Sequence, residues 1–130
     1  ARRWFTSLGD AQLVFCRLRQ LGFLRLLTNR HVMYEEVMRP DAAWEAYRKL
    51  RSDRRIGYLP EPVGLAEVWD SLTRGRRTSP NLWTDAYLCA FVQAAGVTLV
   101  TFDARIPAME GVTCLVLGAG PTSPPRSTPA

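Results

Sequence analysis

One stretch in the second half of the chain constrains the fold more than any other. It is a run that favours a helix, followed by a glycine and then by a run that favours a buried strand. Ser79 can cap the helix, Pro80 suits its first turn, and Gly96 is the kind of residue that ends a helix. Residues 97–102 are apolar or β-branched throughout, which is typical of a parallel strand covered on both faces. We therefore expect a helix and a strand joined by a tight turn.

An acidic residue lies at each end of this unit, Asp85 near the start of the helix and Asp103 after the strand. The helix from Asp85 onward spans roughly 15 Å at about 1.5 Å per residue. The strand returns over roughly 20 Å at about 3.3 Å per residue. Because the two elements run in opposite directions, both carboxylates come back to the carboxyl edge of the strand, where open α/β sheets place their ligands.

Two carboxylates held at one edge of a sheet suit a hard divalent cation such as Mg²⁺ or Mn²⁺. A purely structural explanation of the same residues is also open. Asp85 is favoured near a helix start by the helix dipole, and Asp103 is a common residue in a turn after a strand.

Helix-like and strand-like segments alternate along the rest of the chain. We expect helices over residues 1–8, 18–27, 41–52 and 65–72, and strands over residues 11–16, 56–59 and 112–117. Such alternation predicts α/β layering with a parallel sheet. We expect one domain over residues 1–118, followed by a disordered tail over residues 119–130, which are rich in Gly, Pro, Ser and Thr.

The chain is basic, and nearly all of its positive charge comes from arginine. Seventeen Lys and Arg stand against 12 Asp and Glu in 130 residues, a net charge of +5, and Lys49 is the only lysine. Arginine binds phosphate bidentately, so the charge fits an RNA partner or an acidic protein partner.

The cysteines and the hydropathy indicate where such a chain resides. Cys16, Cys89 and Cys114 lie in apolar surroundings without a CxxC pair, which indicates buried thiols in a reducing compartment and no zinc site. No apolar run approaches the length that spans a bilayer. We therefore expect a cytoplasmic protein without a membrane partner.

Five segments in consistent order resemble the PIN-domain family and, more closely, its VapC-type ribonuclease toxins. They are Thr84-Asp85-Ala86-Tyr87-Leu88, Thr101-Phe102-Asp103 and residues 15–29, 58–62 and 75–80. The resemblance covers roughly residues 1–118 and implies a three-layer α/β/α sandwich with a mostly parallel sheet. It also implies that the chain begins inside the first helix of the family, after a central strand that ends in the first acidic residue.

The resemblance assigns roles to individual residues. It implies a metal-dependent endoribonuclease in which Asp85 and Asp103 bind Mg²⁺ or Mn²⁺. Gln20 stands where the family usually has its second acidic residue and is expected to be a ligand or a substrate contact. Its neutral carbonyl oxygen should bind a cation more weakly than a carboxylate. The partners implied are an RNA substrate, a cognate VapB-type antitoxin and a second copy of the chain in a homodimer.

A basic loop, Arg74-Gly75-Arg76-Arg77, leads into the helix that carries Asp85, and the same distances bring it to the catalytic edge. We expect Arg74, Arg76 and Arg77 to bind RNA phosphates, although an arginine-rich loop is also compatible with simple solvation. Thr101 could hydrogen-bond Asp103 or the scissile phosphate, or be merely a β-branched strand residue.

Two other functions stay open. The chain could be a truncated, catalytically inactive PIN-like protein that binds an antitoxin or another toxin subunit, because the first acidic residue of the family has no counterpart here. It could also be a non-catalytic RNA-binding module that uses the arginine loop alone. The absence of RRM, KH or cold-shock aromatic motifs counts against the second alternative.

Overall fold

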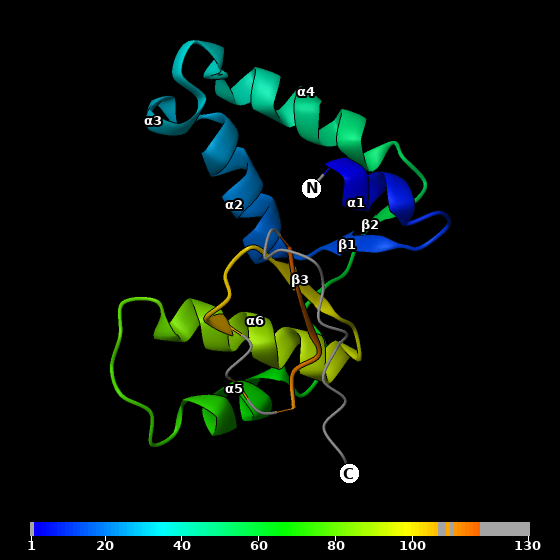
Figure 1. Ribbon diagram of the computed structural model, residues 1–130. Coiled ribbons are helices and arrows are strands. Elements are labelled where there is room, and N and C mark those ends of the chain that lie inside the picture. Colours follow the sequence, from blue (N-terminus) through cyan, green and yellow to red (C-terminus); the bar gives the residue numbers. More distant parts are fainter. Residues whose placement is uncertain (1, 107–108, 110, 118–130) are drawn as a thin grey trace. The chain divides into compact units, whose positions relative to one another are not determined.

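The computed structural model describes residues 2–106, 109 and 111–117 (Figure 1). The chain divides into two compact units, Arg2–Glu61 and a second unit that begins at Pro62, and each is described by itself. The predicted tail over residues 119–130 lies outside the described residues. Within the described part, every helix lacks the length and apolar character that a membrane span requires.

The unit Arg2–Glu61 combines helices with one parallel pair of strands. Its elements in chain order are α1 (Arg2–Ser7), β1 (Leu13–Phe15), α2 (Arg17–Leu27), α3 (Arg30–Met33), the 3₁₀ turn η1 (Tyr34–Glu36), α4 (Pro40–Arg51) and β2 (Ile56–Tyr58). Strands β1 and β2 are paired in register, with Leu13 opposite Ile56 and Phe15 opposite Tyr58.

Contacts between aromatic rings, and between an arginine and a ring, link the elements of this first unit. The ring of Tyr47 on α4 lies 5.6 Å from that of Phe15 on β1 and 6.2 Å from that of Phe23 on α2. Near β2, the guanidinium of Arg55 lies over the ring of Phe5, 4.5 Å from its centroid. Edge-to-face ring contacts and cation–π contacts add to the free energy gained from apolar burial.

The second unit repeats the pattern of helices with a parallel strand pair. It contains α5 (Leu65–Thr73), α6 (Leu82–Ala95), β3 (Leu99–Thr101) and β4 (Cys114–Val116). Strands β3 and β4 are parallel, with Leu99 opposite Cys114 and Thr101 opposite Val116. The connection from β3 to β4 contains residues that are not described.

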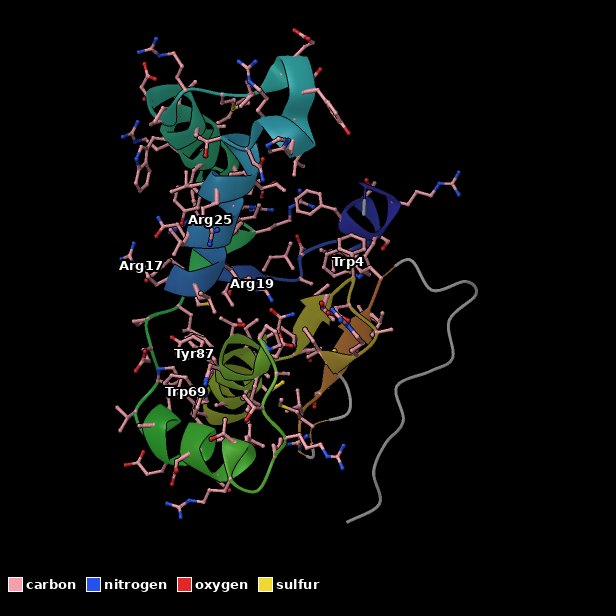
Figure 2. All side chains as sticks on the ribbon, turned by 90° about the vertical axis from the view of Figure 1, so that its left-hand side faces the viewer. Trp4, Arg17, Arg19, Arg25, Trp69 and Tyr87 are labelled. Carbon is pink, nitrogen blue, oxygen red and sulfur yellow. The ribbon has the colours of Figure 1, made fainter. Side chains whose placement is uncertain are left out.

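Helix α6 supplies most of the core of the second unit. Its buried residues are Ala86, Leu88, Cys89, Ala90, Phe91 and Val92. Helix α5 packs against it through Trp69, whose indole N–H donates a hydrogen bond to the carbonyl oxygen of Trp83 at 3.1 Å. The rings of Trp69 and Tyr87 meet edge to face, with their centroids 5.4 Å apart. Figure 2 labels both side chains, one from each of the two helices.

The structure confirms the α/β class that the sequence predicts. Each expected helix and strand is present, and both described strand pairs are parallel. The strands are shorter than predicted, because β3 covers Leu99–Thr101 rather than residues 97–102. The short α3 and η1 were not predicted, since four-residue and three-residue turns are too short to show apolar periodicity.

The predicted cap of the second-unit helix is wrong in detail. Helix α6 begins at Leu82 after Asn81, and Ser79 lies in the preceding turn, where its carbonyl oxygen accepts the N–H of Leu82 at 3.2 Å. The first helical hydrogen bond runs from the N–H of Asp85 to the carbonyl oxygen of Asn81 at 2.9 Å. The end is as predicted, because Gly96 adopts the left-handed conformation with φ of +67°.

Two glycines of the fold should respond in opposite ways to the same substitution. Gly96→Ala places a side chain at positive φ and should lower the free energy of unfolding by about 1 kcal/mol. Gly22→Ala lies inside α2 with no atom within 4 Å of the new Cβ, so it should raise that free energy by about 0.5–1 kcal/mol. Urea unfolding of both variants measures the two effects. Equal signs would show that backbone conformation does not control stability at these sites.

Candidate active site

Asp85 lies in the first turn of α6 and is half-buried. Its neighbours Ala86 and Cys89 have no exposed surface, so the apolar face of the helix is packed and fixes the helix in place. The position of the Asp85 carboxylate is therefore set by packing of the helix that carries it, and a carboxylate in the first turn is also favoured by the helix dipole.

Asp103 follows β3 in a turn that Thr101 holds in place. The backbone N–H of Asp103 donates a hydrogen bond to the hydroxyl oxygen of Thr101 at 3.0 Å. Thr101 is buried, and its carbonyl oxygen accepts the N–H of Leu117 at 2.7 Å. The sequence left open whether Thr101 hydrogen-bonds Asp103, contacts the scissile phosphate or is merely a β-branched strand residue. The structure shows the hydrogen bond to Asp103 and a buried Thr101.

Both carboxylate oxygens of Asp103 accept hydrogen bonds from Arg105. The backbone N–H and Nε of Arg105 bond to Oδ1, each at 2.9 Å, and Nη2 bonds to Oδ2 at 2.7 Å. These bonds lower the pKa of the Asp103 carboxyl to about 2 from its usual 3.8. The guanidinium of Arg105 makes the largest contribution, and its backbone N–H makes the next largest. The pair lies near solvent, since the side chain of Asp103 is 30% exposed and that of Arg105 is 80% exposed.

Asp85 and Asp103 act on the same guanidinium. The pKa of Arg105 is raised mainly by its hydrogen bond to Asp103, and also by the charge of Asp85. Asp103 is therefore the direct partner of Arg105, and Asp85 acts on the same guanidinium through its charge. That the two carboxylates meet at one edge of the sheet stays a prediction.

Arg76 of the basic loop lies in the same region of the unit. Cys89, one turn after Asp85 on α6, has no exposed surface, and burial is the main reason that its thiol pKa is raised to about 11. The charges of Cys114 and Asp85 raise that pKa further, while Arg76 lowers it. Arg76 and Asp85 are therefore both near enough to Cys89 to influence it, and the thiol itself is an unreactive core group.

The three arginines of the basic loop have different surroundings. Arg74 pairs with Asp70 on α5 through Nε and Nη2, at 2.8 and 2.6 Å from Oδ2. Arg76 donates from Nε to the carbonyl oxygen of Leu72 at 2.9 Å. Arg77 is exposed. Arg76 and Arg77 therefore present positive charge to solvent more freely than Arg74 does.

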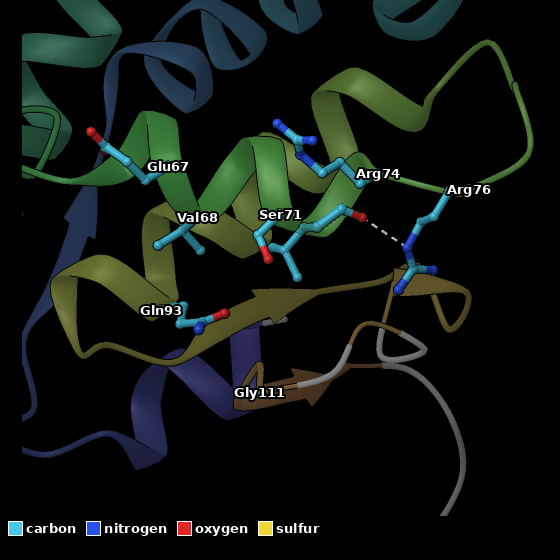
Figure 3. A pocket seen from close by; sticks show the side chains of 8 residues that line it. Glu67, Val68, Ser71, Arg74, Arg76, Gln93 and Gly111 are labelled. Carbon is cyan, nitrogen blue, oxygen red and sulfur yellow. Dashed lines mark hydrogen bonds between the residues drawn. The ribbon is translucent and has the colours of Figure 1, made fainter.

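An open groove of about 610 Å³ runs beside this loop. Its lining residues come from α5, the basic loop, the end of α6 and the approach to β4; they include Glu67, Ser71, Arg76, Gln93 and Gly111. Figure 3 shows Arg76 at one end of the groove, with Gln93 and Gly111 on its opposite wall from α5. The groove is polar and accommodates both charges and hydrogen-bonding groups.

Gln20, the predicted counterpart of the second acidic residue, belongs to the other unit. It is buried on α2, and its side-chain oxygen accepts a hydrogen bond from Nη1 of Arg17. Arg17 lies near the start of the same helix (Figure 2), and its guanidinium also lies 5.1 Å from the centroid of the Tyr58 ring. The oxygen of Gln20 that was expected to face a cation or substrate is thus bonded to Arg17. Of the three predicted catalytic residues, Asp85 and Asp103 belong to one unit and Gln20 to the other.

The donor set fits a hard divalent cation in kind but is sparse. Among the described residues, no group of three His, Cys, Asp or Glu side chains could hold a metal ion. Asp85 and Asp103 offer carboxylate oxygens, which Mg²⁺ and Mn²⁺ prefer, and Mg²⁺ commonly completes its shell with water and substrate phosphates. These two residues are the ones that would hold such an ion.

The sequence analysis missed two arginines that bond to predicted site residues, one in each unit. Arg105 neutralises Asp103, and Arg17 occupies the oxygen of Gln20. A signal for the first existed, because an arginine two residues after an aspartate can bond back to its carboxylate. The same spacing recurs at Asp53 and Arg55, and there it forms the same bonds.

Comparison with known proteins agrees with this arrangement. The family model of the PIN domain matches residues 1–112. Ribonuclease VapC41 of Mycobacterium tuberculosis is 34% identical over 122 residues, which cover 90% of this chain and 84% of that protein. Ribonuclease VapC38 of the same organism is 33% identical over 108 residues, which cover 81% of this chain and 71% of that protein.

The residues that match the family model include both acidic motifs, 84–88 and 101–103. The match also agrees with the parallel strand pairs of the two units. The chain therefore belongs to the PIN-domain family, as a relative of the VapC-type ribonucleases.

Proposed function

We propose that the chain is a metal-dependent endoribonuclease toxin that cleaves RNA phosphodiester bonds and is neutralised by a VapB-type antitoxin. The observation that supports the proposal is that Asp85, in the first turn of α6, and Asp103, in the turn after β3, belong to one compact unit and lie within the residues that match the PIN-domain family. The ribonuclease names of the relatives support the reaction type.

Each residue of the site has a task in this reaction. When bound, Mg²⁺ or Mn²⁺ would polarise the scissile phosphate and lower the pKa of a water molecule. Asp85 and Asp103 supply the negative charge that holds the ion. Thr101 fixes the turn of Asp103, which we favour over a direct contact with RNA because the residue is buried. Arg76 and Arg77 bind RNA phosphates, and Arg74 contributes less because it is paired with Asp70.

One observation favours the alternative of an inactive PIN-like interaction module. The side-chain oxygen of Gln20 is bonded to Arg17, and the described residues hold no cluster of three acidic or other metal-binding side chains. Such a chain would keep its antitoxin-binding or subunit-binding surfaces without cleaving RNA. Measuring cleavage and metal binding in the same preparation separates the two functions.

The partners follow from the family and the charge. We propose a cognate VapB-type antitoxin and a homodimer, and the net charge of +5 suits a partner with acidic segments. Co-expression of the chain with the product of a small neighbouring gene tests the first partner, by co-purification and by loss of RNA cleavage. Sedimentation equilibrium of the chain alone tests the second.

Removing either carboxylate should abolish the metal-dependent reaction. Asp103→Asn and Asp85→Asn should each lower the rate of RNA cleavage by more than about a hundredfold, since even an outer-shell partner of a metal site costs up to that factor. Both should also weaken Mn²⁺ binding measured by calorimetry without RNA. Cleavage time courses with Mn²⁺, and again after chelation, give the rates.

Asp53→Asn is the matched control for these variants. Asp53 has the same bonds to Arg55 that Asp103 has to Arg105, but it belongs to none of the segments that resemble the PIN-domain family. It should leave cleavage and Mn²⁺ binding unchanged. Cleavage that survives in both Asp85→Asn and Asp103→Asn would remove the assignment of these residues.

Thr101 should act through the position of Asp103. Thr101→Val keeps the shape but removes the hydroxyl that accepts the N–H of Asp103, so it should weaken Mn²⁺ binding about tenfold and lower stability by about 1 kcal/mol. Thr101→Ser retains the hydroxyl and should restore most of the affinity. Calorimetry at a matched fraction of folded protein measures this, and equal affinities of the valine and serine variants would rule out the role.

A further inference from the structure

Arg105 holds the carboxylate that the proposed function requires for a metal ion. Its three hydrogen bonds to Asp103 occupy Oδ1 twice and Oδ2 once. A guanidinium and a divalent cation compete for the same carboxylate oxygens, because both are cations that bind them directly. Metal binding at Asp103 therefore competes with the side-chain bonds of Arg105.

The chain contains an internal comparison for this ion pair. Arg55 bonds to Asp53 in the same way, with its backbone N–H and Nε on Oδ1 at 2.9 and 3.0 Å and Nη2 on Oδ2 at 2.7 Å. The two pairs differ in their surroundings. The side chain of Arg55 is 27% exposed and its guanidinium lies over the ring of Phe5, whereas that of Arg105 is 80% exposed.

In the charge around each guanidinium the two pairs are alike. The pKa of Arg105 is raised mainly by its hydrogen bond to Asp103 and also by the charge of Asp85, and the pKa of Arg55 is raised mainly by Asp53 and also by the charge of Asp10. The greater exposure of Arg105 therefore distinguishes its pair, and an exposed ion pair contributes little to stability, so little free energy opposes its exchange for a divalent cation. Once released, the guanidinium remains attached two residues from Asp103, beside the place where a phosphate would bind.

We propose that Arg105 is an exchangeable counter-ion of this site: it pairs with Asp103 in the metal-free chain, and it turns to the RNA phosphate when a divalent cation binds. The exchange keeps the positive charge at the site and makes the guanidinium available for bidentate binding of phosphate. The second half of this inference rests on the proposed RNA cleavage, whereas the first half concerns the metal ion alone.

The test compares Arg105→Gln with the unaltered chain in Mn²⁺ titration calorimetry without RNA. Removing the competing cation should tighten Mn²⁺ binding about two- to fivefold, which corresponds to the free energy of an exposed ion pair. With saturating Mn²⁺, the same variant should raise the KM for an RNA oligonucleotide about tenfold, because one charge-assisted phosphate contact is lost. A merely structural role would not move the two quantities in opposite senses.

Two further variants make the result specific. Arg55→Gln removes the corresponding pair in the other unit and should change neither the Mn²⁺ affinity nor the KM. Arg105→Lys keeps the charge without the bidentate geometry and should give intermediate values. Thermal melts without metal establish that each variant is folded.

The outcomes separate this inference from the proposed function. Tighter Mn²⁺ binding by Arg105→Gln supports the counter-ion role even if no preparation cleaves RNA, in which case the proposed function and the phosphate contact fail. Unchanged or weaker Mn²⁺ binding by that variant, or no measurable binding by the unaltered chain, overturns the inference.

Discussion

The packing of α6 is the constraint on which the candidate site depends. Six of its residues are buried, and the glycine at its end turns the chain back toward β3 through a left-handed conformation. The buried residues lie on all sides of the helix, so close packing holds α6 in place, and with it the position of Asp85 in its first turn. The turn after β3, held by Thr101, then sets the position of Asp103.

Several arginines of this chain are already paired with aspartates, so part of its high positive charge is not available to bind phosphate. Arg74, Arg55 and Arg105 are each bonded to an aspartate a few residues away, and only their remaining donors can meet a phosphate. Exposed pairs of this kind contribute little to stability and exchange partners readily. In the unit that holds Asp85 and Asp103, local pairing therefore keeps Arg74 and Arg105 in ion pairs that an incoming phosphate or metal ion could displace.

The sparse donor set gives the site its particular chemistry. Two carboxylates leave most of the coordination shell of Mg²⁺ or Mn²⁺ to water and substrate, so metal affinity should depend strongly on each remaining donor. The bond between Arg17 and Gln20 limits what the neutral oxygen could add. A site of this type would bind its metal more tightly together with RNA than alone, since phosphate oxygens complete the shell.

The sequence by itself determined the order of the elements, and it predicts two carboxylates at one edge. Apolar runs, Gly96 and the spacing between Asp85 and Asp103 are local signals, and the periods of helix and strand convert them into positions. The boundaries were less certain: Ser79 precedes the helix rather than capping it, because Asn81 supplies the first helical carbonyl. Five segments in consistent order, residues 84–88 and 101–103 among them, indicated the family, which the comparison confirmed.

Only the tertiary structure decided which polar groups are already engaged. The bond of Gln20 to Arg17, the burial of Thr101 and the pairing of Asp103 with Arg105 depend on side-chain directions and on the packing around them. A sequence pattern gives the position of a residue on an element, but hydrogen-bond partners follow from distances of about 3 Å, which only packing fixes.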